Sequence, residues 1–149
     1  MSTIIHERVA SARRGENPTV IARTRAAWAV MKDVQLPRGS CFLLPDPVVA
    51  ELTDLPPETL AAFLADMADL GAAILAATDA IRINYHILAN TEPALRAHVV
   101  PRYADEPSEM LRRPTCFYDT TDAPRFDPVS DRPLMDAIAK ELHKRGATG

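Results

Sequence analysis

Residues 56–78, PPETLAAFLADMADLGAAILAAT, limit the fold of this chain more than any other segment. Their apolar side chains recur at intervals of three and four residues, which is the spacing of one face of an α-helix. Two prolines and Glu58 open the segment, as suits a first helical turn. Gly71 costs up to about 1 kcal/mol relative to alanine inside a helix, so we expect it to mark a close packing contact. The segment predicts one long central helix.

Short strand-like segments flank this helix on both sides. Residues 26–33 and 41–45 precede it, and residues 82–90 and 94–100 follow it. Apolar and polar residues alternate in three of these segments, which is typical of strands, while 41–45 is a continuous apolar run that fits a buried strand. Turn residues separate the members of each pair, so each pair predicts a hairpin. The order of elements favours an α+β fold, with one antiparallel sheet and a long helix across it.

The remaining segments complete one expected domain over residues 1–149. Residues 1 to about 25 are polar and mixed, and they predict a short helix or a loose arm. Residues of about 103–131 are irregular and rich in proline, so they must cover this domain or a neighbouring chain. Residues 133–146 predict an amphipathic C-terminal helix that ends at Gly146. Four or five strands leave an exposed sheet edge, and pairing of that edge favours a homodimer.

Composition narrows the functional classes. A chain of 149 residues has the length of one domain, and its net charge of −3 gives no footprint for nucleic acid. Cys41 and Cys116 form no CxxC pair, so neither a zinc knuckle nor a redox dithiol is expected, and no cofactor is implied. We expect no membrane span, because no uninterrupted run of about 18 apolar residues occurs. The N-terminus lacks a signal-peptide layout, which favours a cytoplasmic location.

The stretch EPALRAHVVPRY, residues 92–103, contains the candidate site. Side chains alternate across a strand, so Ala94, Arg96 and His98 are expected on one face. Taken alone, His98 is most simply a strand histidine bonded to a backbone carbonyl, and Arg96 a surface arginine. His86 precedes them on the neighbouring strand. It joins them only if the strand register allows it, because a slip of one residue moves a side chain to the other face.

These residues resemble the histidine triad (HIT) superfamily of nucleotide-binding proteins. The resemblance rests on HVVPRY after a short strand and on INYHILANTEP before it. The segment AWAVMKDVQLPRGSCFLLPDP is similar to the first hairpin of that family, and the central helix follows where the family has one. The resemblance covers most of the chain. It implies a HIT-like fold, a homodimer, and a nucleotide or nucleoside phosphate ester as ligand.

The triad itself departs from the family pattern. His98 corresponds to its third histidine, whereas Arg96 stands in the place of the central, nucleophilic histidine and Ala94 in the place of the first. In the family, the central imidazole attacks the α-phosphorus and forms a covalent nucleotidyl intermediate. An arginine cannot do this, because its guanidinium stays protonated and offers no lone pair. Its planar set of donors nevertheless suits a phosphate. The alternative is that Arg96 fills the place of the missing histidine and blocks the pocket.

The resemblance also suggests which side chains contact the ligand. His98 is the one candidate catalytic residue that remains. The candidate phosphate- or nucleotide-binding residues are Arg96, Asn90, Thr91, His86 and Asn84.

Three hypotheses follow from these residues. The first is a HIT-type nucleotide-binding protein, related to hydrolases of nucleoside phosphates and dinucleoside polyphosphates, with weak or lost hydrolase activity. The second is a non-catalytic dimeric scaffold that binds no nucleotide. The third is an enzyme with relocated chemistry, in which His98 or His86 acts as nucleophile or base.

Overall fold

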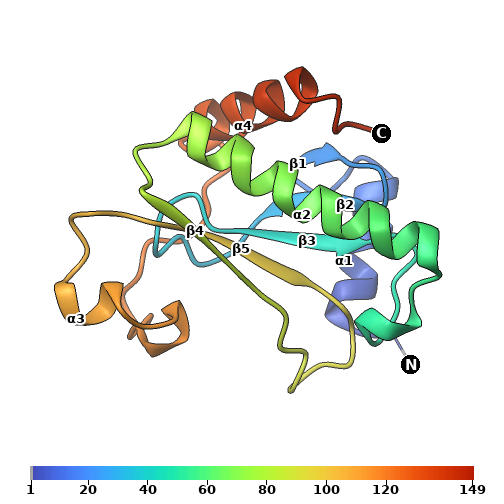
Figure 1. The fold of residues 1–149 in the computed structure, drawn as a ribbon, viewed down its shortest axis with the longest axis horizontal. Coiled ribbons are helices and arrows are strands. Elements are labelled where there is room, and N and C mark those ends of the chain that lie inside the picture. The colour runs from blue at the N-terminus through green and yellow to red at the C-terminus, as the bar shows by residue number, and fades with distance from the viewer. Residues whose placement is uncertain (1) are drawn as a thin grey trace.

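Residues 2–149 are described by a computed structural model, in which one five-stranded antiparallel sheet carries helices on both faces (Figure 1). The strand order is β1-β2-β3-β5-β4. The strands are β1 (Val20–Arg23), β2 (Ala27–Met31), β3 (Cys41–Pro45), β4 (Arg82–His86) and β5 (Ala97–Arg102). The helices are α1 (Ile4–Arg13), α2 (Pro57–Ala77), α3 (Ser108–Leu111) and α4 (Arg132–Lys144), with 3₁₀ turns η1 (Leu52–Asp54) and η2 (Thr115–Phe117). The expected α+β class is confirmed.

The long helix α2 packs across one face of the sheet. Phe63, Leu70 and Ile74 are fully buried on its inner side. Gly71 is also buried, and a Cβ atom built on it would lie 1.9 Å from the hydroxyl oxygen of Tyr85 on β4. The close contact expected at this glycine is therefore confirmed. Helix α4 lies beside α2 on the same side of the sheet (Figure 1).

Helix α2 is also apolar enough to qualify, by length and composition only, as a membrane-spanning helix. Its mean hydropathy over 18 residues is 1.7, and it is the single helix within residues 2–149 that passes this test. The core helix of a soluble protein passes the same test. The packing of α2 on the sheet accounts for its apolar inner side.

Helix α1 covers part of the opposite face. Ile5 and Val9 pack there with Val30 of β2 and Leu44 of β3, and Ala94 completes this smaller cluster. The N-terminal region therefore contains a packed helix, which is the first of the two expected alternatives, and also the edge strand β1. The C-terminus lies along β1, where Thr24 and Thr148 form a β-bridge. The other edge of the sheet is β4.

Strand β5 begins later and ends later than the sequence suggests. Residues 94–96 do not pair with β4, because the backbone N–H of Leu95 donates to Val49 and that of Ala94 to Glu92. Pro101 does not end the strand, which continues to Arg102. β4 ends at His86, four residues before the end of the expected segment. These differences shorten the hairpin and leave a long loop in front of His98.

The irregular segment after β5 folds back on its own chain. Gln35 N–H donates to Pro124 O, and Phe126 N–H donates to Asp33 O, both at 2.8 Å. The buried guanidinium of Arg102, only 2% exposed, holds the earlier part of the segment. Its five N–H donors are used by the carboxylate of Glu106, the side-chain oxygen of Asn84 and the carbonyls of Met110 and Arg113.

We expect Arg102→Met to lower the free energy of unfolding by about 3 to 5 kcal/mol, because it leaves the Glu106 carboxylate buried without its partner. Urea unfolding followed by circular dichroism measures the change. The matched control is Arg132→Met. Arg132 forms an exposed ion pair with Asp136 at 3.8 Å, so its loss is expected to cost less than about 1 kcal/mol. Equal losses in the two variants would contradict a structural role for the buried pair.

Candidate nucleotide site

The candidate site is built on the hairpin of β4 and β5. His86 and His98 are direct cross-strand partners, and they lie on the sheet face opposite α2. Their rings stack with centroids 4.3 Å apart and an interplanar angle of 21°. The register that the sequence left open therefore brings the two imidazoles together.

Strand β3 and the residue after β2 place two further side chains beside His98. Phe42 on β3 is the partner of His98 across the sheet, and its ring meets the imidazole edge-on at 4.8 Å. Lys32, just after β2, places its Nζ 3.0 Å from His98 Nδ1 and 4.9 Å from the centre of the Phe42 ring. We call His86, His98 and Lys32 the histidine cluster. Lys32 was missed by the sequence reasoning, although Trp28, Val30 and Lys32 follow the two-residue period of one strand face.

Burial controls the protonation of the histidine cluster. It combines with the charge of Lys32, and with His86 and Arg96, to lower the pKa of His98 from 6.5 to about 3. Burial also lowers the pKa of His86, with a contribution from Lys32. Lys32 is itself desolvated, which lowers its pKa from 10.5 to about 8. The lowered pKa values favour the neutral form of both imidazoles at pH 7, whereas a pKa of about 8 leaves Lys32 mostly protonated.

The Lys32 ammonium determines what His98 can do. An ammonium has donors only, so at pH 7 it donates to Nδ1 of His98. The single proton of the neutral imidazole then resides on Nε2. His98 therefore has an N–H donor at Nε2, and it has no free lone pair there with which to attack phosphorus.

Arg96 lies in the loop before β5. Its Nη1 donates to the carbonyls of Ala94, at 2.9 Å, and Glu92, at 3.3 Å. Its Nε and Nη2 make no hydrogen bond to any residue from 2 to 149 and remain available to a ligand. Arg96 is therefore anchored by its own loop, and its positive charge contributes to the lowered pKa of His98 and of Lys32.

The remaining candidate residues differ in their positions. Asn84 lies two residues before His86 on the same strand face, and its Oδ1 accepts a 2.7 Å hydrogen bond from Arg102. Its amide N–H groups can still donate. Asn90 and Thr91 are exposed residues of the long loop between β4 and β5, and their side chains make no hydrogen bond within the described chain. The structure places Asn84, but not these two, beside the histidine cluster.

A cavity of about 640 Å³ adjoins the histidine cluster at His86. We call it the basic cavity, because Arg82, Arg102, Arg112 and Arg113 line it and no Asp or Glu does. The other lining residues are Ile83, Asn84, Tyr85, His86, Leu88, Leu111, Pro114 and Cys116. Such a lining is electrostatically suited to an anion.

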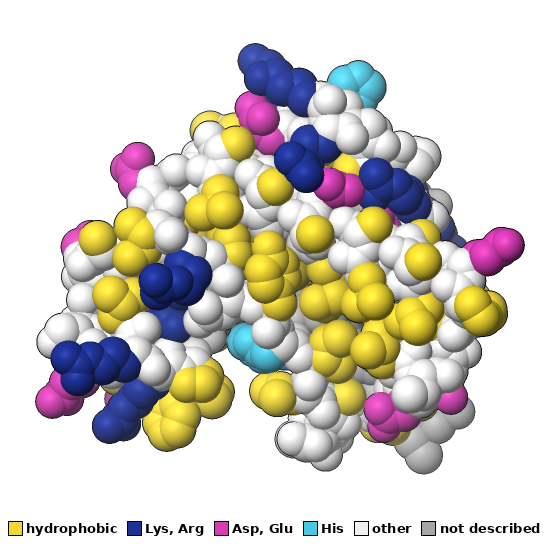
Figure 2. Space-filling view, in the orientation of Figure 1, with side chains coloured by type: hydrophobic (Ala, Val, Ile, Leu, Met, Phe, Trp, Pro, Cys, Tyr) yellow, Lys and Arg dark blue, Asp and Glu magenta, His cyan; other side chains and the backbone are white. Residues whose placement is uncertain are grey.

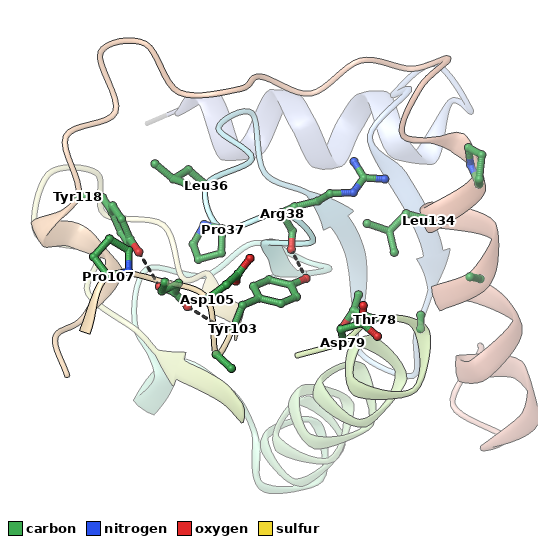
Figure 3. A pocket seen from close by; sticks show the side chains of 15 residues that line it. Leu36, Pro37, Arg38, Thr78, Asp79, Tyr103, Asp105, Pro107, Tyr118 and Leu134 are labelled. Atoms are coloured by element: carbon green, nitrogen blue, oxygen red, sulfur yellow. Dashed lines mark hydrogen bonds between the residues drawn. The ribbon is translucent and has the colours of Figure 1, made fainter. Parts of the chain in front are cut away.

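A larger cavity, of about 920 Å³, lies elsewhere (Figure 3). Asp79, Asp105 and Glu106 all line it. Its one basic side chain, Arg38, pairs with Asp131 at 2.7 Å. The negative charge of this lining would repel a phosphate. The larger cavity is therefore less suited to a phosphate than the basic cavity, in spite of its greater volume. Among residues 2–149, no group of three or more His, Cys, Asp or Glu side chains is placed to hold a metal ion.

Comparisons with solved structures identify the fold. The chain is similar to a histidine triad protein from Sinorhizobium meliloti 1021, with a TM-score of 0.71, 21% identity, and coverage of 87% of this chain and 94% of that one. It is similar to a histidine triad protein from Bradyrhizobium japonicum, with a TM-score of 0.72, 17% identity, and coverage of 88% and 95%. It is also similar to a hypothetical histidine triad nucleotide-binding protein from Sulfolobus tokodaii, with a TM-score of 0.70, 12% identity, and coverage of 91% of this chain and 90% of that one.

No protein-family model matches the sequence, and no curated protein does either. The likeness is thus one of three-dimensional structure. The chain has the histidine triad fold, and the resemblance noted in its sequence is confirmed at that level.

We expect His98→Gln to flatten the dependence of stability on acid pH. The folded pKa of about 3 lies below the ordinary 6.5, so only the unfolded chain binds this proton between those values. Stability therefore falls as the pH drops from 6.5 towards 3, by at most about 1.4 kcal/mol per pH unit from this one group. Urea unfolding between pH 4 and 7 measures the slope. His143→Gln, on the exposed side of α4, is the control, and equal slopes in the two variants would contradict the buried neutral state of His98.

Proposed function

We propose that this chain binds a nucleoside phosphate ester at the histidine cluster and does not cleave it by the covalent route of the HIT family. The observation that carries the proposal is the contact of Lys32 Nζ with His98 Nδ1. It combines a positive charge and an imidazole N–H donor at one point of the sheet. A phosphate matches both, since charge-assisted hydrogen bonds to its oxygens are strong.

Further donors surround that point. Arg96 offers its unused N–H groups, and Asn84 its side-chain amide. The Sulfolobus tokodaii protein of the same fold is described as nucleotide-binding, which supports a nucleotide as the ligand. The candidate roles of Asn90 and Thr91 stay predictions, as do the single domain and the cytoplasmic location.

Two features argue against cleavage of the bound phosphate ester. Arg96 stands where the family has its nucleophile and has no lone pair to offer. His98 carries its proton on Nε2 while Lys32 is charged, so the alternative in which His98 attacks the substrate requires a deprotonated Lys32. Binding without efficient cleavage is the function that this arrangement favours.

We expect AMP or GMP to raise the stability of the protein in a thermal-shift measurement. A ligand at one hundred times its dissociation constant adds about 2.7 kcal/mol. Lys32→Met should weaken binding by about tenfold, the effect of one charge-assisted contact. Lys140→Met, at an exposed lysine of α4, is the matched control and should bind as the native chain does. Absence of any shift with AMP, GMP and ADP at millimolar concentration would favour the scaffold hypothesis.

The lost nucleophile is tested by Arg96→His. Release of nucleotide from dinucleoside polyphosphates and from nucleoside phosphoramidates, followed by chromatography, should be very slow with the native chain. If the native chain releases product as fast as the variant, the reasoning about Arg96 is wrong.

We also propose that the protein is a homodimer that pairs through α2 and the β4 edge. Leu64, Leu75 and Tyr85 are 41% to 45% exposed there, although they are large and apolar. Figure 2 shows the apolar side chains as a broad patch on this face of the molecule. A second copy can cover such a patch with the same patch of its own and can pair the free strand edge.

We expect the native chain to have twice the mass of 16.3 kDa in light scattering, and Leu75→Asp to have the mass of one chain. Val129→Asp is the control, because Val129 is 81% exposed but lies in the irregular segment. A native mass of one chain would contradict the dimer.

A further inference from the structure

The larger cavity has the size and the apolar walls of a small-molecule site. Its volume is about 920 Å³, and sites of this kind occupy roughly 300 to 1,000 Å³. Four separate parts of the chain supply apolar side chains to it, namely Leu36 and Pro37 before β3, Ala77 at the end of α2, Pro107 after β5, and Leu134 in α4. None of the residues 2–149 lines both this cavity and the basic cavity, so the two are separate sites.

Two tyrosines add aromatic surface whose orientation is fixed by hydrogen bonds. The hydroxyl of Tyr103 donates to the carbonyl of Arg38 at 2.6 Å, and that of Tyr118 donates to the carboxylate of Glu106 at 2.7 Å. Burial raises the pKa of both hydroxyls, and Glu106 helps to raise that of Tyr118 to about 12. Both rings therefore stay neutral and held in place at pH 7, which reduces the entropy lost when a ligand binds.

The larger cavity carries negative charge that no protein group neutralises. Glu106 and Arg38 line it too, but each is already held in an ion pair. Asp79 and Asp105 are exposed, and neither side chain forms an ion pair or a hydrogen bond with any residue from 2 to 149. In Figure 3 these two carboxylates lie on different sides of Tyr103, and the charge of Asp79 contributes to the raised pKa of that tyrosine.

The end of helix α2 adds to this negative charge. Ala77 and Thr78 line the cavity, and Asp79 follows them directly. The C-terminus of a helix carries partial negative charge, which a basic side chain in the last turn commonly offsets. The last turn of α2 contains no basic residue. A positively charged ligand is therefore favoured at this end of the cavity.

We propose that the larger cavity binds a small organic cation, which is a protonated amine attached to an apolar or aromatic body. The body packs against Leu134 and the tyrosine rings, and the ammonium lies beside Asp79 and Asp105. Aromatic rings also attract an ammonium through their faces. A bare metal ion does not suit this site, because no group of three or more His, Cys, Asp or Glu side chains within residues 2–149 is placed to hold one.

Three compounds that share a phenyl ring and differ in charge test the proposal. They are 2-phenylethylamine, 2-phenylethanol and 3-phenylpropionate, each titrated into the native chain and followed by NMR of the protein. We expect the amine to bind about ten times more tightly than the alcohol, and added salt to reduce the difference. The propionate should bind most weakly, and the ring protons of Tyr103 and Tyr118 should shift on binding of the amine. Equal binding of amine and alcohol, or no binding of the amine, would overturn the proposal.

The role of the carboxylates is tested by Asp79→Asn, a change at an exposed residue that keeps the shape of the side chain. We expect it to weaken binding of the amine by about threefold to fivefold, the value of one exposed ion pair, and to leave binding of the alcohol unchanged. Glu58→Gln is the matched control, because it removes the same charge at the other end of α2, about 30 Å away. Equal weakening in the two variants would reduce the effect to net charge and contradict a site at Asp79.

The proposal goes beyond the nucleotide site and does not depend on it. The titrations contain no nucleotide, and AMP should bind to Asp79→Asn as it does to the native chain. A failure of the amine to bind therefore leaves the proposed function standing, and a failure of AMP to bind leaves the cation site standing.

Discussion

The buried guanidinium of Arg102 connects the sheet to the irregular segment on which both cavities depend. It is almost completely removed from water, and each of its N–H donors has an acceptor in the protein. Loss of Glu106 would leave the charge unpaired in a medium of low dielectric, and loss of any other partner would leave a buried N–H donor unsatisfied, both of which are costly. The carboxylate of Glu106 neutralises the charge of Arg102 and lines the larger cavity, while Arg102 itself lines the basic cavity. One ion pair thus fixes the walls of two pockets whose charges are opposite.

Because side chains alternate along a strand, one face of the sheet packs into the core and the other face carries the candidate site. Ala97 and Val99 of β5 face α2 and belong to the main core, whereas His98 between them faces the other way. The core can therefore be apolar without interruption, and the polar side chains gather where no long helix covers the sheet. Partial burial on that open face also keeps His98 neutral and, by lowering the pKa of Lys32 to about 8, makes its ammonium a stronger acid than that of a surface lysine.

Much of this arrangement could be predicted from local pattern. The spacing of apolar residues placed α2 to within a residue at each end, and alternation identified the strands that carry His86 and His98. The four-residue strand β1 was missed, because VIAR is too short to show a period. Lys32 was missed for a different reason. Its position follows from alternation, but its nearness to His98 depends on β3 lying between β2 and β5, and no local pattern encodes that order.

The fold class and the central helix followed from the sequence alone, because they depend on residue identity and on short-range periodicity. Tertiary structure decided the register that stacks His86 on His98 and the contact of Lys32 with Nδ1. It also decided the assembly of Arg82, Arg112 and Arg113 around one cavity. These features join residues that are distant in the chain, so they exist only once the sheet has paired and the segment after β5 has folded back onto it.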